Sequence, residues 1–184
     1  MKRQNPLQKA YRRIETEGKK HSICLYSATA MALWQHWGKK QEAINRLFDV
    51  TRDIWTECAE DHDHSMIQMC EAETGIEIQN GDGKGWRDVH YLNGTIPEYM
   101  TPAQVLYMRQ QQIKWIRPQV MACMLIALHR KYKFGFERCS RIYQQINDIE
   151  AEYRANPERL RKACYEMTGF DVAETTTTDR RESA

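Results

Sequence analysis

The chain has 184 residues, enough for one compact domain or two small ones, and 41% hydrophobic with 28% charged residues is typical of a folded protein. Its 27 Lys and Arg against 25 Asp and Glu leave a net charge of +2, so the total charge does not indicate a partner. No run approaches the roughly 18 consecutive apolar residues of a membrane-spanning helix, and the N-terminus does not resemble a signal peptide. We therefore expect a cytoplasmic protein.

The first third of the chain predicts three helices. Residues 5–18 carry a short apolar stripe and many basic residues, which is typical of a surface helix. Residues 21–37 are apolar on most faces, so we expect a buried helix that ends at Gly38. Residues 41–59 show a 3.6-residue period, and their predicted buried face is made of Ile44, Leu47, Phe48, Thr51, Ile54, Trp55 and Cys58.

The middle of the chain predicts a short helix and a long loop. One of the residues in 61–65 caps a helix that runs to Thr74, and Gly75 stands where a left-handed C-terminal residue is wanted. Residues 76–78 leave as an extended segment. Residues 79–100 contain several glycine-rich turn signals, so we expect a loop that separates two modules.

The second half predicts the same elements again. Thr101 caps a helix that reaches Arg117, and Pro118 starts the next, buried helix. Residues 136–153 repeat the amphipathic pattern, and Asn156 caps a last helix that stops at Gly169. The tail after it has no large apolar residues and is expected to be disordered.

The two halves align as an internal repeat. The segment CEAETGIEI (70–78) returns as CYEMTGFDV (164–172), and upstream the offset is 95 residues. Chance likeness between two helical segments is the alternative, but identities persist through three successive elements, which favours duplication. The identical pairs upstream are Ala32, Leu33, Glu42, Arg46, Asp53, Ile54 and Glu57 with Ala127, Leu128, Glu137, Arg141, Asp148, Ile149 and Glu152.

The repeat predicts an all-α fold with two tandem related three-helix modules packed together. A basic N-terminal helix (1–20) precedes an acidic first module (21–78). The connecting loop (79–100) leads to a basic second module with a leading helix (101–172), and the disordered tail follows (173–184).

The cysteines do not predict chemistry. They show no CxxC pair or framework spacing, so we expect reduced and mostly buried thiols. In each repeated segment the Thr-Gly pair reads as a helix stop, and the cysteine before it lacks the neighbouring base that a catalytic thiol needs. The six are Cys24, Cys58, Cys70, Cys123, Cys139 and Cys164.

Two polar stretches suggest sites that the sequence does not support further. The segment EDHDH (60–64) has metal-ligand residue types, but the second copy has an ordinary helix start there, which favours a helix cap. A small metal-dependent enzyme that uses His62 and His64 stays open as an alternative. The segment GDGKGW (81–86) lacks the phosphate-loop pattern and is expected to be a flexible loop. We therefore expect no enzyme, no metal and no cofactor.

Charge separates the two copies. Residues 49–83 hold ten acids against one Arg, whereas residues 109–141 hold eight basic residues against one Glu. A basic region with interleaved aromatics can bind phosphates and stack on bases, and acids can approach a basic groove of a partner protein. Solvated faces that attract one another are the alternative. The predicted nucleic-acid set is Arg109, Lys114, Arg117, Arg130, Lys131, Lys133, Arg138 and Arg141, and the predicted partner-binding set is Glu57, Glu60, Asp61 and Asp63.

Two long segments, HSICLYSATAMALWQHWGKKQEAINRLFDVTRDIWTECAEDHDHSMIQMCEAETGIEI (21–78) and MRQQQIKWIRPQVMACMLIALHRKYKFGFERC (108–139), resemble small phage and prophage proteins of gut bacteria. Within that group the chain is similar to type II anti-CRISPR proteins. The resemblance implies an inhibitor that binds the RNA-guided CRISPR effector nuclease, free or guide-loaded, in the bacterial cytoplasm. It would block target DNA engagement or cleavage, with contact to duplex DNA or guide RNA. A phage DNA-binding or regulatory protein, for which the basic region would suffice, is the competing class.

Overall fold

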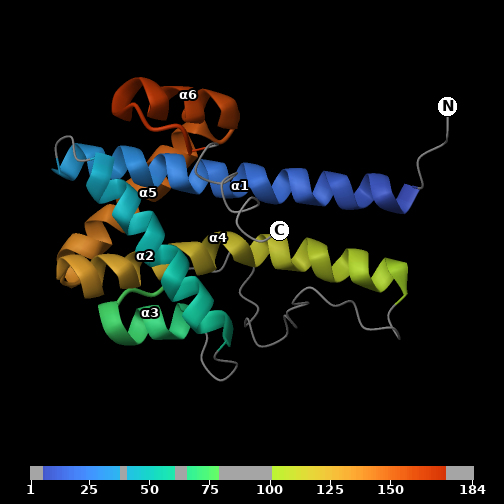
Figure 1. The fold of residues 1–184 in the computed structure, drawn as a ribbon, viewed down its shortest axis with the longest axis horizontal. Helices are drawn as coiled ribbons and strands as arrows, with labels where there is room; N and C mark the ends of the chain where they lie inside the picture. The colour runs from blue at the N-terminus through green and yellow to red at the C-terminus, as the bar shows by residue number, and fades with distance from the viewer. Residues whose placement is uncertain (1–5, 38–40, 61–65, 79–100, 173–184) are drawn as a thin grey trace.

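The computed structural model describes residues 6–37, 41–60, 66–78 and 101–172, which form helices joined by short non-helical segments, without a strand. The all-α fold class is therefore confirmed. None of the described helices is long and apolar enough to cross a membrane. The six helices, drawn in Figure 1, are α1 (Pro6–Trp37), α2 (Gln41–Glu60), α3 (Met66–Thr74), α4 (Pro102–Tyr132), α5 (Phe136–Tyr153) and α6 (Pro157–Thr168).

Two predicted helix boundaries are wrong, because α1 and α4 are each one continuous helix. Helix α1 passes through Gly18 without a break between residues 18 and 21. A single interior glycine costs only about 1 kcal/mol relative to alanine, less than a helix end with its unpaired backbone groups. Helix α4 likewise contains Pro118 in its interior. A proline there costs about 3 kcal/mol, and the fully buried run 121–128 that follows offsets it.

The predicted helix caps at Thr101 and Asn156 are confirmed. The Thr101 side chain accepts a hydrogen bond from the backbone N–H of Gln104 (3.4 Å), and Gln104 Oε1 accepts one from the Thr101 backbone (2.8 Å). The Asn156 side chain accepts from the N–H of Arg159 (3.2 Å). The residues 61–65 that were expected to cap α3, the loop 79–100 and the tail 173–184 lie outside the described ranges.

The Thr-Gly pair ends α3 as the sequence predicts. Gly75 has a φ of +73°, and its N–H donates to the Glu71 carbonyl at 2.8 Å. The Thr74 hydroxyl donates to the Cys70 carbonyl (2.7 Å) and accepts from the N–H of Ile76 (3.2 Å). The hydroxyl thus pairs a helix carbonyl and the first amide beyond the helix, and Ile76 turns back into the core.

The second copy repeats this corner at the end of α6. Gly169 has a φ of +70°, and its N–H donates to the Tyr165 carbonyl at 2.8 Å. The Thr168 hydroxyl donates to the Cys164 carbonyl (2.7 Å) and accepts from the N–H of Phe170 (3.1 Å). The two corners share the glycine N–H bond and both hydrogen bonds of the threonine hydroxyl, which supports the internal duplication.

The amphipathic helices also repeat. In α2 the predicted face is buried, apart from the half-buried Trp55. In α5 the buried side chains are Cys139, Ile142, Ile146 and Ile149. Each of these four positions lies 95 residues after a buried residue of α2, namely Ile44, Leu47, Thr51 and Ile54.

The two copies pack together by exchanging partners. Helices α2 and α3 pack mainly on α4 of the other copy, whereas α5 and α6 pack mainly on α1. The buried side chains accordingly form one core. Figure 1 shows α1 and α4 running in the same direction, with α6 on the α1 side and α2 and α3 on the α4 side.

A pseudo-two-fold axis passes between α1 and α4. The Thr29 hydroxyl contacts the Met124 sulfur at 3.2 Å, and these two residues are 95 positions apart, so they are equivalent in the repeat. Equivalent residues meet where a two-fold axis passes through an interface. The chain is therefore arranged like a dimer of the repeat, with both halves covalently linked.

Candidate nucleic-acid and partner interface

The eight basic residues predicted to bind nucleic acid divide into three groups. The side chains of Arg109 and Lys114 lie outside the described part of the structure. Arg117 and Arg130 form ion pairs inside the molecule. The remaining four are exposed around the turn between α4 and α5, and we call them the α4–α5 corner: Lys131, Lys133, Arg138 and Arg141.

Arg117 joins α4 to α5. Its Nε donates to Glu150 at 2.8 Å, and its terminal nitrogen donates to Asn147 at 2.5 Å. The side chains of Arg117 and Glu150 are only 31% and 16% exposed, so the pair is shielded from solvent. The guanidinium is therefore held by this bridge, which makes Arg117 a structural residue.

Arg130 joins the basic copy to the acidic copy. Its terminal nitrogens reach Glu73 at 2.6 Å and Glu57 at 3.5 Å. The hydrogen bond that Arg130 donates to Glu73 raises the pKa of Arg130 above its ordinary value. The expected attraction between the copies is thus realised at this point, and Glu57, predicted to bind a partner, faces Arg130. The side chain of Glu60 and residues Asp61 and Asp63 lie outside the described ranges.

The backbone positions the α4–α5 corner through a tight turn. Lys133 ends α4 with a φ of +57°, and its N–H donates to the Leu128 carbonyl. The Arg138 guanidinium lies 5.6 Å from the centre of the Phe134 ring, a distance that allows a cation–π contact. Across the described residues no ion pair neutralises Lys131, Lys133, Arg138 or Arg141.

The corner combines charge with an exposed ring. Helix α5 begins at Phe136 after Gly135, which provides no side-chain cap, so the positive end of the helix dipole adds to the local field. The Phe136 side chain is 58% exposed. The equivalent positions of the first copy are His36, Gly38, Ala43, Arg46 and, for the ring, Gln41. Three of the four cations and the ring are thus particular to the second copy.

Most of the thiols are buried, and burial raises the pKa of several of them. All six cysteines are free, and five of them are buried, as predicted, while Cys24 is half-buried. Burial raises the pKa of Cys70 to about 11 and that of Cys139 to about 11. Hydrogen bonding to Cys58 and burial raise the pKa of Cys123 further. Since the thiolate is the nucleophile, these groups are poor nucleophiles near neutral pH.

The two polar stretches considered as sites fall outside the described residues. These are the segment 60–64, apart from the backbone of Glu60, and the segment 81–86. Within the ranges that the structure describes, no group of three or more His, Cys, Asp or Glu side chains could hold a metal ion.

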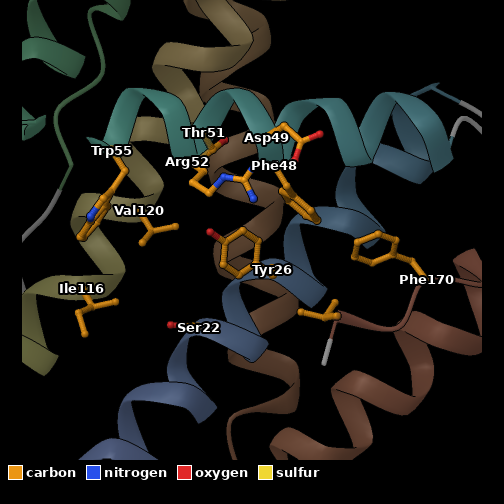
Figure 2. Close-up of a pocket in the computed structure, with 11 residues that line it drawn as sticks. Ser22, Tyr26, Phe48, Asp49, Thr51, Arg52, Trp55, Ile116, Val120 and Phe170 are labelled. Carbon is orange, nitrogen blue, oxygen red and sulfur yellow. Dashed lines mark hydrogen bonds and ion pairs between the residues drawn. The ribbon is translucent and has the colours of Figure 1, made fainter. Parts of the chain in front are cut away.

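Sequence reasoning missed a cavity beside α2. Figure 2 shows it between α1, α2, α4 and the segment after α6, with Trp55 and Tyr26 on opposite sides and Arg52 between them. The apolar pattern alone assigned Phe48 and Trp55 to a filled core. A comparison of Ser22 with Arg117, its equivalent in the repeat, would have indicated missing volume at this place.

Comparisons of the chain with protein-family models, with curated proteins and with solved structures found no match. The α4–α5 corner is the strongest candidate for a contact with phosphates.

Proposed function

We propose that this protein is a phage-encoded anti-CRISPR protein. It acts by binding, without catalysis of its own, in the cytoplasm of a bacterial host. Its partner is a type II CRISPR effector nuclease, and it hinders target DNA engagement or cleavage. The observation that carries the proposal is the α4–α5 corner, where four exposed cations and an exposed phenylalanine lie around one turn and no ion pair with a described acid neutralises the cations.

The corner suits a surface that carries nucleic acid. Lysine and arginine side chains at a protein surface bind phosphates, and a phenylalanine can stack on an unpaired base. A guide-loaded nuclease offers both groups, because its guide RNA and target strand lie in an open, basic channel. The exposed acids of α2, such as Asp49 and Asp53, can face the basic walls of that channel.

A cleavage assay tests this proposal. Purified protein is added to a type II nuclease before or after the guide RNA, and cut target DNA is measured. The variant Lys133→Glu/Arg138→Glu reverses two charges of the corner and is expected to weaken inhibition at least tenfold. The control Arg154→Glu/Lys162→Glu makes the same charge change at exposed positions elsewhere and should inhibit like the unchanged protein.

Two results would contradict different parts of the proposal. If the corner variant inhibits as strongly as the unchanged protein, the corner is not the contact. If the unchanged protein neither binds nor inhibits any type II effector under conditions where a known inhibitor does, the anti-CRISPR function is wrong.

A DNA-binding or regulatory phage protein is the second candidate, and the same corner favours it. Titration of duplex DNA in rising salt, without nuclease, separates the two. Four phosphate contacts predict a slope of about −3.6 in log affinity against log salt. A regulator should also prefer one sequence by roughly a thousandfold or more, whereas an inhibitor that depends on the nuclease should bind free duplex weakly and without preference.

A further inference from the structure

A cavity of about 290 Å³ opens beside α2. Its walls are apolar and come from three helices, with Tyr26 from α1, Trp55 from α2, and Ile116 and Val120 from α4. Tyr26, Trp55 and Ile116 are only partly buried, so the cavity communicates with solvent. Preformed apolar cavities with a few polar groups at the edge are typical of binding sites.

The second copy fills the equivalent place. Arg117 lies there in a bridge to Glu150 and Asn147. The repeat places these three residues at the positions of Ser22, Trp55 and Arg52 in the first copy.

The replacement changes both the volume and the chemistry of the place. Serine in place of arginine leaves the space open, and tryptophan in place of glutamate removes the carboxylate that would hold a cation. Because the second copy folds with this place filled, the scaffold does not require an opening. The cavity is therefore a feature that the first copy acquired or kept for another purpose.

The size and lining select the occupant. A volume of about 290 Å³ is at the lower end of the range for small-molecule sites, so it suits a single large side chain. Phe48 and Phe170, whose rings lie 5.5 Å apart, form an apolar part of the lining. In protein interfaces the dominant contacts are aromatic or large apolar anchors seated in pockets of this kind.

The edge of the cavity carries negative charge. Asp49 and Asp53 stand four residues apart on one stripe of α2, whereas Glu57, one turn further along, faces Arg130. Asp49 lines the cavity, and its side chain is 63% exposed although it contacts Arg52. Asp53 is exposed and has no ion pair among the described residues. A partner segment with Lys or Arg beside its anchor is complementary to this stripe.

We propose that the cavity receives one large apolar side chain, flanked by basic residues, from a partner protein. The identification of that partner as the CRISPR nuclease depends on the function proposed above. The cavity itself and its preference for a basic segment with an apolar anchor do not.

The second copy supplies the design of the test. The variant Ser22→Arg/Arg52→Asn/Trp55→Glu copies the bridge of Arg117 into the first copy and fills the cavity. The control Asn45→Arg/Arg46→Asn/Thr56→Glu introduces the same residue types on the exposed face of α2. Thermal unfolding within a few degrees of the unchanged protein establishes that each variant is folded.

Two titrations test which kind of side chain enters the cavity. The first uses the guide-loaded nuclease, and the filled variant is expected to bind at least tenfold more weakly than the control. The second follows amide NMR shifts of the unchanged protein with the peptide Lys-Lys-Trp-Lys-Lys. This peptide should shift the amides of residues that line the cavity, whereas Lys-Lys-Ala-Lys-Lys should not. The peptide experiment does not need any variant to fold.

The outcomes distinguish the two proposals. Unchanged binding of nuclease and peptide by a folded filled variant would overturn the cavity assignment, as would equal shifts from both peptides. If adenosine monophosphate shifts the cavity residues and the tryptophan peptide does not, the site accepts a nucleobase and the protein-anchor proposal is wrong. If the tryptophan peptide enters the cavity but no type II nuclease binds, the cavity proposal stands and the anti-CRISPR function fails.

Discussion

The two copies of the repeat agree where the backbone requires a residue and differ where a side chain faces outward. Both end in a Thr-Gly corner with the same hydrogen bonds, at Gly75 and at Gly169. Beside α2, however, the first copy has Ser22 and a cavity. At the equivalent place beside α5, the second copy has Arg117 in an ion pair with Glu150. This contrast shows that duplication preserved the scaffold and left the flanks free to acquire separate functions.

Because of the exchange of helix partners, the two copies are not independent folding units. If each copy folded around its own core, one could unfold without the other. Because α2 and α3 pack on α4, and α5 and α6 pack on α1, both copies bury their apolar faces in a shared core. We therefore expect the two copies to differ in what they bind but to unfold together.

The largest effect is expected from truncations in the core, which test whether the two copies unfold together. Leu47→Ala and Ile142→Ala truncate equivalent positions, which are 0% and 2% exposed. Each change removes buried volume and should lower the free energy of unfolding by about 2 to 5 kcal/mol. Chemical denaturation followed by circular dichroism and by tryptophan fluorescence should give one coincident transition for both variants. Two separated transitions in either variant would show that the copies unfold independently.

The sequence predicted the helices that form the core better than it predicted which helices pack on one another. The stripe of α2, the caps at Thr101 and Asn156 and the stop at Gly75 depend on neighbours within a few residues, so local patterns reveal them. The exchange of partners could not be read, because α1 and α4 each contain a long buried run and the pattern of α2 does not distinguish between them. The interior Pro118 misled the prediction for the same reason, since distant packing outweighs its local cost.

The sequence predicted which residues belong to the candidate site, but it did not predict how folding arranges them. The basic residues of α4 and α5 were identified from the sequence. Which of them are free depends on acids brought close by folding, namely Glu150 for Arg117 and Glu73 for Arg130. The cavity beside α2 depends on the absence of a side chain, which has no local signal in the sequence, although the repeat marks the position.

The repeated cysteines predict a pH dependence of intermediate size. Burial raises the pKa of Cys70 from 9.0 to about 11 in the folded state, and burial also raises the pKa of its equivalent, Cys164. The folded state therefore holds these protons where the unfolded state releases them. The stability contributed by each protonated thiol is present below pH 9 and is lost as the pH rises toward 11, by roughly 2 to 3 kcal/mol for Cys70.

Denaturation between pH 8 and pH 11 measures this loss. The variants Cys70→Ala and Cys164→Ala should each flatten the decline relative to the unchanged protein, since the titrating group is gone. Burial also raises the pKa of Cys139 and Tyr132, and comparison with the unchanged protein cancels their contribution. If only Cys70→Ala flattens the curve, the thiol environments of the copies differ although both thiols contact the threonine hydroxyl of their corner.

The smallest expected effect distinguishes the two Thr-Gly corners. Alanine at a positive φ costs about 1 to 2 kcal/mol, so Gly75→Ala and Gly169→Ala should both destabilise the protein by that amount. A Cβ at Gly75 would lie 3.2 Å from a ring carbon of Phe136, whereas a Cβ at Gly169 would meet nothing within 4 Å. Gly75→Ala should therefore cost a few tenths of a kcal/mol more, as measured by denaturant unfolding.

The control for this pair is Gly135→Ala, because Gly135 has a φ of −80° and a Cβ there also meets nothing within 4 Å. The stability of this variant should stay about equal, because the restriction of the unfolded chain by alanine offsets its weaker preference for the N-cap position of α5. Equal losses for Gly75→Ala and Gly169→Ala would mean that the Phe136 ring moves aside at no cost. Such a ring would be free to stack on a base. A larger loss for Gly75→Ala would mean that the first copy holds this ring in place, so that one copy positions the binding surface of the other.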